Sequence, residues 1–200
     1  MVAFLLRVVV ASSNAGKLRE LRSLLGDFAA EIVPQSALGI EPADETETSF
    51  EGNALLKARH AAHRSGSPAL ADDSGLEVDA LGGRPGIYSA RYAGPGASDA
   101  DNNALLLREL AAVPEPRTAR YRCAIAFVRE ATESNPLIVS ASWDGRIASS
   151  PRGAGGFGYD PLFLVGVGAR TAAEFGADEK NRVSHRALAL RGLLERLGRA

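Results

Sequence analysis

Residues 5–17 read LLRVVVASSNAGK, and this stretch favours an α/β fold. Leu5 to Ala11 is a short, nearly continuous apolar run, as in a strand buried on both faces. Ser12 to Gly16 follow as a loop, and Lys17 to Leu25 carry leucines at helical spacing, with Gly26 ending the helix. A buried strand that turns directly into an amphipathic helix is a building unit of layered α/β folds.

The same loop is a candidate phosphate site. A loop between a strand and a helix presents backbone N–H groups at the helix N-terminus, and Lys17 adds a full positive charge. It is not a Walker A loop, because Ala11 stands in place of the first glycine and Leu18, not Ser or Thr, follows the lysine. An ordinary strand-to-helix turn with a surface lysine is the alternative interpretation.

Helices and strands alternate irregularly along the rest of the chain, without repeats or linkers. Tyr121 to Phe127 alternate in polarity and face a second strand across a turn at Ser134 to Pro136, which indicates an antiparallel pair. The pattern predicts a mixed, twisted sheet flanked by helices, in one domain over residues 1–200. The other expected elements are strands at Ile32–Val33, Pro68–Ala71, Leu76–Ala80 and Leu137–Ile147, helices at Ser49–Arg64 and Ser98–Val113, and a closing helix with Val183, Ala187, Leu190, Leu194 and Leu197 on its apolar stripe.

The composition narrows the choice of partners and compartment. The formal net charge of −1 and pI near 6.3 provide no global attraction to nucleic acid or membrane. No apolar run is long enough to span a bilayer, and the N-terminus lacks an export signal. The single cysteine, Cys123, excludes an internal disulfide, and its alternating neighbours indicate a small core residue. We therefore expect a cytoplasmic protein.

Acidic residues form two candidate clusters. Asp72-Asp73-Ser74-Gly75 follows an apolar strand, and we place it at the carboxyl end of that strand, where α/β sheets bind ligands. Two acids there need pairing, hydration or a metal ion, and on an extended chain their side chains point in opposite directions. One can hold Mg²⁺ while the other orients water or a backbone group, and a carboxylate beside the metal can serve as a base. An Asx-type turn is the alternative interpretation of this segment. Glu45 and Glu47, the second cluster, precede a helix, and their negative charges equally suit the positive N-terminal end of the helix dipole.

Two further segments suit a nucleotide. Gly153 to Asp160 are rich in glycine, which lets backbone approach a ligand, and Phe157 offers a face on which a base can stack. Lys180 is one of only three lysines beside 20 arginines, with Lys17 and Lys57, and Ser184-His185-Arg186 opens the last helix. A flexible loop around a buried aromatic, and a packing or capping role for His185, are the plainer interpretations.

Taken in order, these segments resemble the inosine triphosphate pyrophosphatase family, the non-canonical purine NTP pyrophosphatases. The resemblance runs from about Val8 to Leu194. Each motif alone is weak, but five in register are specific. The motifs are SNAGK at 13–17, FEGNALLKA at 50–58, ADDSGLEVDALGGRPGIYSARYAG at 71–94, GGFGYDPLF at 155–163 and SHR at 184–186.

The resemblance implies Mg²⁺-dependent hydrolysis of ITP, dITP and XTP to monophosphate and pyrophosphate, by a homodimer whose subunits have two lobes around a cleft. Glu45 and Asp73 would hold Mg²⁺, Asp73 would also be the base for water, and Lys57 would reach the triphosphate. Asp72 would lie beside Asp73. The residues expected on the substrate are Ser12, Ser13, Asn14, Ala15, Gly16, Lys17, Ser74, Phe157, Gly158, Tyr159, Asp160, Lys180, His185 and Arg186.

Two positions depart from the family pattern. Glu47 stands where a glycine is common, so it competes with Glu45 as a metal ligand, and Gly52 stands where an acid is usual. The rival functions are a septum-inhibitor-like pyrophosphatase for modified or pyrimidine nucleotides, a non-catalytic nucleotide sensor or RNA-binding module, and a nucleotide kinase. The intact acids and lysines argue against the sensor, the charge argues against RNA, and the missing Walker A loop argues against the kinase.

Overall fold

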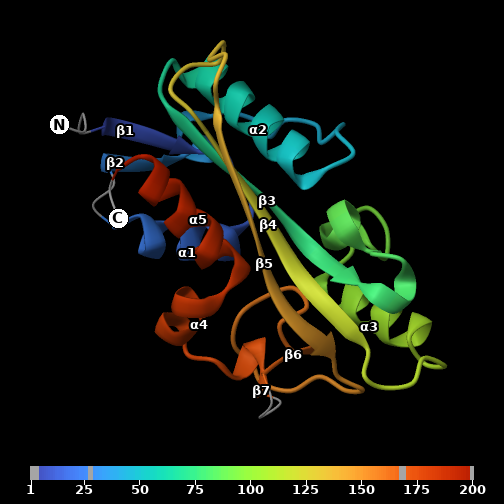
Figure 1. The fold of residues 1–200 in the computed structure, drawn as a ribbon. Helices are drawn as coiled ribbons and strands as arrows, with labels where there is room; N and C mark the ends of the chain where they lie inside the picture. Colours follow the sequence, from blue (N-terminus) through green and yellow to red (C-terminus); the bar gives the residue numbers. More distant parts are fainter. Residues whose placement is uncertain (1–4, 27–28, 167–169, 199–200) are drawn as a thin grey trace. The chain divides into compact units, whose positions relative to one another are not determined.

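The computed structural model describes residues 5–26, 29–166 and 170–198, and it contains the mixed α/β fold that the sequence predicts (Figure 1). One sheet has the strand order β2-β1-β3-β4-β5-β6-β7. β1 pairs in parallel with β2 and β3, whereas β5, β6 and β7 pair antiparallel. The strands are β1 (Leu5–Val10), β2 (Ala29–Pro34), β3 (Ala69–Val78), β4 (Thr118–Val128), β5 (Leu137–Ile147), β6 (Phe163–Val165) and β7 (Arg170–Thr171).

The helices begin and end close to where capping residues predict. Asn14 caps α1, Ser49 caps α2 with Gly66 in the left-handed region at its end, and Ser98 forms a capping box with Asp101 at the start of α3. None of the described helices is long and apolar enough for a bilayer. The helices are α1 (Ala15–Leu25), α2 (Phe50–Ser65), α3 (Asp99–Glu109), α4 (Ala177–Val183) and α5 (His185–Arg196), with short 3-10 segments at Gln35–Leu38, Asp79–Leu81, Gly86–Arg91 and Ala172–Glu174.

Three expectations about these elements are wrong. The strands expected at 68–71 and 76–80 are one continuous strand, β3, so Asp72-Asp73-Ser74-Gly75 lies inside a strand and not at its carboxyl end. α3 ends at Glu109 and not near Val113, because Leu110 turns into the core and Pro114 disfavours helix before it. Ser184 is extended and separates α4 from α5, so Val183 ends α4, where it is 39% exposed.

The chain forms two compact units, each with its own core. Unit 1 contains residues 1–73, 123–141 and 186–200. Alternate residues of its strands, such as Val8, Val10 and Leu70, pack against Leu21 of α1 and Leu190 of α5. α2 lies on the opposite side of these strands (Figure 1). Unit 2 contains residues 74–122 and 142–185, and its core gathers Leu76, Leu106, Tyr121, Trp143, Tyr159, Leu162 and Phe163.

Candidate active site

Asp72 and Asp73 are consecutive in β3, and their side chains serve opposite faces of the strand, as the extended backbone predicts. Asp72 is 1% exposed and meets groups from α1 and α5, whereas Asp73 is 5% exposed and meets groups from α2. All these partners belong to unit 1. The strand therefore separates two carboxylates that are adjacent in sequence and gives each a different environment.

The Asp72 carboxylate is held by two cations and a thiol. Lys17 Nζ lies 2.6 Å from Oδ1, Arg186 Nε donates to Oδ2 at 3.0 Å, and Cys123 Sγ donates to Oδ2 at 2.9 Å. Arg186 is also paired with Glu20. Burial alone raises the pKa of Asp72, but Arg186 and Lys17 outweigh it and hold that pKa well below its ordinary value. Asp72 is therefore an anchor that stays ionised and fixes Lys17.

The Asp73 carboxylate shares one ammonium group with Glu45. Lys57 Nζ donates to Asp73 Oδ1 at 2.7 Å and to Glu45 Oε1 at 2.8 Å. Burial opposes the charge on Lys57, yet the two carboxylates prevail and raise its pKa. Burial also raises the pKa of Asp73, against the opposing effects of Lys57 and Lys17. A carboxylate whose pKa is moved toward neutral is a better proton acceptor than an exposed one.

Asn53 of α2 fixes Asp73 from its other oxygen. Asn53 is fully buried; its Nδ2 donates to Asp73 Oδ2 at 3.4 Å, and its Oδ1 accepts the Glu47 N–H at 3.1 Å. Asn53 and Lys57 lie one turn apart on one face of α2, and both reach the same carboxylate. One asparagine thus ties the acidic segment before α2 to β3.

The two departures from the family pattern fit each other. A Cβ built on Gly52 would lie 2.8 Å from Glu47 Cβ, closer than such atoms approach. The glutamate at 47 therefore requires the glycine at 52. Glu47 is exposed, whereas Glu45 is half-buried and shares Lys57 with Asp73. Of the two glutamates, the geometry favours Glu45 as the one that accompanies Asp73.

The carboxylates of Glu45 and Asp73 form a set of oxygen donors that suits a hard divalent cation, one that also binds phosphate. Glu45 Oε1 and Asp73 Oδ1 both lie within 2.8 Å of one ammonium nitrogen, so two carboxylates converge on a cationic position. Within the described parts of the chain, no group of three or more His, Cys, Asp or Glu forms a complete metal cage. Mg²⁺ accepts such a sparse set, because it commonly uses one or two carboxylates with waters and substrate phosphates.

The predicted phosphate loop opens α1. Asn14 accepts the Lys17 N–H at 3.0 Å, and Ser12 Oγ accepts the Asn14 N–H at 3.2 Å, so the loop is shaped by its own side chains. Ala15 and Gly16 begin the helix, where N–H groups have no partner within the helix. Ser13 to Ala15 are exposed, and the Lys17 ammonium is anchored on Asp72. The loop presents these N–H groups beside a fixed lysine.

The glycine-rich loop at Gly153 to Asp160, called the base loop because it is predicted to bind the purine base, lies in unit 2 and wraps around the Asp160 carboxylate. Asp160 Oδ2 accepts the Phe157 N–H at 2.9 Å and pairs with Lys180 Nζ at 2.5 Å, while Tyr121 OH donates to Oδ1 at 3.2 Å. Gly156 has φ +73°, and a Cβ there would overlap Asp160 Oδ2. The glycine is therefore required by the close approach of the loop to this carboxylate.

The remaining predicted site residues are placed as follows. Lys180 lies 5.0 Å from the centre of the Phe157 ring, and the Tyr159 hydroxyl donates to the Ser89 carbonyl at 2.8 Å inside the core. His185 is buried and stacks on Tyr121, with ring centres 4.6 Å apart. Ser74 follows Asp73 in β3. Their contacts with a substrate, and those of Arg186, stay predictions.

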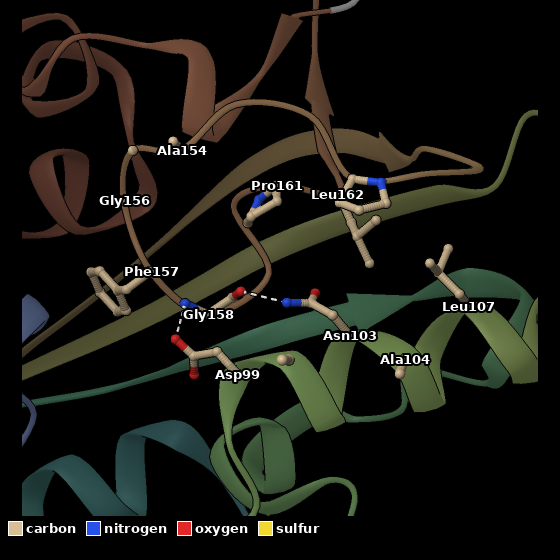
Figure 2. Close-up of a pocket in the computed structure, with 13 residues that line it drawn as sticks. Asp99, Asn103, Ala104, Leu107, Ala154, Gly156, Phe157, Gly158, Pro161 and Leu162 are labelled. Carbon is tan, nitrogen blue, oxygen red and sulfur yellow. Dashed lines mark hydrogen bonds between the residues drawn. The ribbon is translucent and has the colours of Figure 1, made fainter.

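Sequence reasoning missed several residues that hold the predicted ones. Glu20 pairs with Arg186, Tyr121 supports Asp160 and His185, and Asp99 and Asn103 of α3 contact the base loop (Figure 2). No local signal marks Glu20 or Tyr121, because their contacts join segments far apart in the chain. Asp99 and Asn103 do show one sign: they lie four residues apart, on one face of a predicted helix.

Known proteins resemble the chain over nearly its whole length. The Ham1 family model matches residues 8–196. The dITP/XTP pyrophosphatase of Methylococcus capsulatus is 56% identical, over 96% of each chain, and that of Escherichia coli O157:H7 is 53% identical, over 96% of this chain and 98% of its own. A solved HAM1 protein from Coxiella burnetii is 45% identical and superposes with a TM-score of 0.88, over 98% of this chain and all of that one. The chain therefore belongs to the Ham1 family.

Proposed function

We propose that this protein hydrolyses ITP, dITP and XTP to the nucleoside monophosphate and pyrophosphate, with Mg²⁺, and so cleanses the nucleotide pool. The observation that carries the proposal is the convergence of Glu45, Lys57 and Asp73 in unit 1, which also contains the α1 loop and its anchored Lys17. The relatives named dITP/XTP pyrophosphatases support the same activity.

In this proposal the reaction is attack of water on the α-phosphorus. The water oxygen forms a bond to that phosphorus, the bond to the bridging oxygen of the β-phosphate breaks, and pyrophosphate leaves. Asp73 accepts the water proton, for which its raised pKa suits it. Lys57 and Lys17 offset the negative charge on the phosphate oxygens, and the N–H groups at the start of α1 orient the phosphates.

Mg²⁺ fits as the cofactor, with Glu45 and Asp73 as its protein ligands. When bound, it would neutralise phosphate oxygens and lower the pKa of a coordinated water. Lys57 pairs with the same two carboxylates and holds both beside one cationic group, so both would be available to the ion.

The base loop would supply selectivity in this proposal. Hypoxanthine and xanthine have a carbonyl at C6, where adenine has an amino group. Hydrogen-bond donors from His185, Arg186 or backbone would therefore favour hypoxanthine and xanthine over adenine. A buried site built on hydrogen bonds discriminates by about 10⁴ when a partner is missing. Guanine shares the carbonyl, so it must be excluded at C2. Phe157, half-buried in the loop, would provide the stacking face.

The test is pyrophosphate release from ITP, XTP, dGTP and ATP with Mg²⁺, for the wild type and Asp73→Asn. We expect rapid release from ITP and XTP only, and a loss of about 100-fold or more in the variant, as for removal of a general base. The matched control is Asp144→Asn, since that side chain is 87% exposed on β5; it should keep full activity.

The other outcomes each point to a rival. Equal release from all four nucleotides would leave a pyrophosphatase without the proposed selectivity. Preference for modified or pyrimidine nucleotides would favour the septum-inhibitor-like activity, and tight ITP binding without turnover would favour a sensor. We further propose a homodimer, to be checked by light scattering, and a cytoplasmic location, which the unpaired, buried Cys123 thiol supports.

A further inference from the structure

Gly158 of the base loop is held at both of its backbone groups by two side chains of α3. The Gly158 N–H donates to Asp99 Oδ2 at 2.6 Å, and Asn103 Nδ2 donates to the Gly158 carbonyl at 2.9 Å. Figure 2 shows both side chains reaching the loop from successive turns of the helix. Gly158 has φ +62°, so the loop turns sharply here. An acceptor and a donor four residues apart therefore fix the orientation of this turn.

The residue before the turn is fixed from elsewhere in unit 2. The Phe157 N–H donates to Asp160, whose carboxylate is in turn held by Lys180 and Tyr121. The Phe157–Gly158 segment is thus tied to Asp160 at one end and to α3 at the other. Phe157 is the residue proposed to stack on the base, so these ties set the position of its ring.

Packing does not position the α3 side of this loop. A pocket of about 470 Å³, partly open to solvent, lies between α3 and the loop, with Asn103, Ala104, Leu107, Gly156, Pro161 and Leu162 among its lining residues (Figure 2). A filled core holds a segment in place by contact on all sides, and an open pocket lacks those contacts. Asp99 and Asn103 span this side, so on the side of α3 the turn at Gly158 is held by their hydrogen bonds.

We propose that Asp99 and Asn103 are positioning residues that set the affinity and selectivity of the enzyme for the purine base. The inference rests on the proposed function, and it names residues of α3 that act through Gly158 and Phe157 without touching substrate. Losing either hydrogen bond frees the turn at Gly158. The Phe157 ring, which would stack on any purine, then leaves its position, and so does the loop backbone, which in the proposed function would favour the C6 carbonyl. Phosphate binding and the chemistry at Asp73 belong to unit 1 and keep their own residues.

The test compares Asp99→Ala and Asn103→Ala with the wild type in steady-state hydrolysis of ITP and ATP. We expect KM for ITP to rise by a factor of up to about ten, as for the loss of one hydrogen bond that is exposed at Asp99 and partly buried at Asn103, with kcat close to the wild-type value. The ratio of kcat/KM for ITP to that for ATP should fall by a similar factor. That ratio does not depend on the fraction of folded enzyme, because both substrates meet the same sample.

Two matched variants separate positioning from helix stability. Asp101→Ala removes the capping box of the same first turn, but among the residues that the structure describes Asp101 forms side-chain hydrogen bonds to Ser98 and none to the loop. It should lower the melting temperature and keep the ITP to ATP ratio. Asp99→Asn retains a side-chain oxygen that can accept the Gly158 N–H, so it should restore most of the selectivity lost in Asp99→Ala.

The inference and the proposed function fail in different ways. If the wild type is selective for ITP and both alanine variants keep its KM and its ratio, the inference is wrong and the function stands. A loss confined to kcat, or an equal loss of selectivity in Asp101→Ala, would also overturn it. If the wild type does not hydrolyse ITP at all, the proposed function fails and the inference fails with it.

Discussion

The most informative residues are the two neighbouring acids of β3. The two residues are adjacent in the sequence, yet their partners differ. Asp72 contacts Lys17, Arg186 and Cys123. Asp73 contacts Asn53 and Lys57, and Lys57 also pairs with Glu45. Three groups hold Asp72 in full burial and keep its pKa low, so it suits a permanent charge. Asp73 has a raised pKa and faces a cation that it shares, so it suits proton transfer.

This contrast predicts opposite consequences for two conservative substitutions. Asp72→Asn leaves the buried Arg186 and the half-buried Lys17 without their common counter-charge, and removing one partner of a buried ion pair costs about 3–5 kcal/mol. Glu20 still pairs with Arg186, which favours the lower end of that range. Asp73→Asn leaves Lys57 paired with Glu45 and should cost less stability while losing activity. Urea unfolding monitored by circular dichroism measures the difference.

Asp144→Asn again serves as the control, because its exposed carboxylate contributes little. Equal urea midpoints for Asp72→Asn and Asp144→Asn would show that the buried network adds no net stability. A greater loss of stability in Asp73→Asn than in Asp72→Asn would reverse the roles that we assign to the two acids.

At the scale of elements, the sequence predicted what depends on local pattern. Apolar residues at helical spacing and capping residues located α1, α2 and the start of α3, and the apolar run located β1. Continuity of β3 was missed because Asp72-Asp73-Ser74-Gly75 has the composition of a turn. Only tertiary partners, Lys17, Lys57 and Arg186, make two acids tolerable in a strand. Likewise, the break at Ser184 has no glycine or proline to mark it.

The residues of the candidate site divide in the same way, into those that the local sequence marks and those that only tertiary contacts reveal. The chemistry-bearing residues stood out by type, because acids and lysines are rare choices for a buried strand and its neighbours. Residues that position them, such as Glu20, Asn103 and Tyr121, are ordinary in sequence and acquire their roles only through contacts between distant segments. Sequence patterns carry no information on such contacts.

The start of α2 offers a prediction about two coupled positions. Gly52→Ala introduces a Cβ that collides with Glu47 Cβ, so it should destabilise the wild type. In a Glu47→Gly background only the Ser49 hydroxyl stays close, at 3.1 Å, and once it shifts slightly the better helix propensity of alanine should stabilise the protein by roughly 0.5–1 kcal/mol. A double-mutant cycle on urea midpoints measures the coupling. Additive effects within about 0.3 kcal/mol would show that the two departures from the family pattern are independent.

At the scale of the whole molecule, the division into two units does not follow the strands. Three of the four unit boundaries, after Asp73, Arg122 and Ala141, lie inside β3, β4 and β5, and the fourth lies at the start of α5. Each of these strands continues from one unit into the other without a linker. Unfolding either unit therefore removes hydrogen-bonded partners from strands that the other unit also uses, and we expect one cooperative transition.

Each unit contains one natural probe for that prediction. Trp143, the only tryptophan, is buried in the core of unit 2, and Cys123, the only cysteine, is buried in unit 1. Burial first, and then the charge of Asp72, raise the pKa of the Cys123 thiol well above its ordinary value, so it should react with a thiol reagent only after unfolding.

Trp143 fluorescence and brief thiol labelling of Cys123 should therefore give the same urea midpoint. The control is Cys123→Ser, which must abolish labelling while the fluorescence transition remains. If the thiol becomes reactive at a lower urea concentration than that at which fluorescence changes, unit 1 unfolds first and the shared strands do not couple the units. The reverse order would assign the weaker core to unit 2. Coincidence of the two curves is the outcome that the continuous strands require.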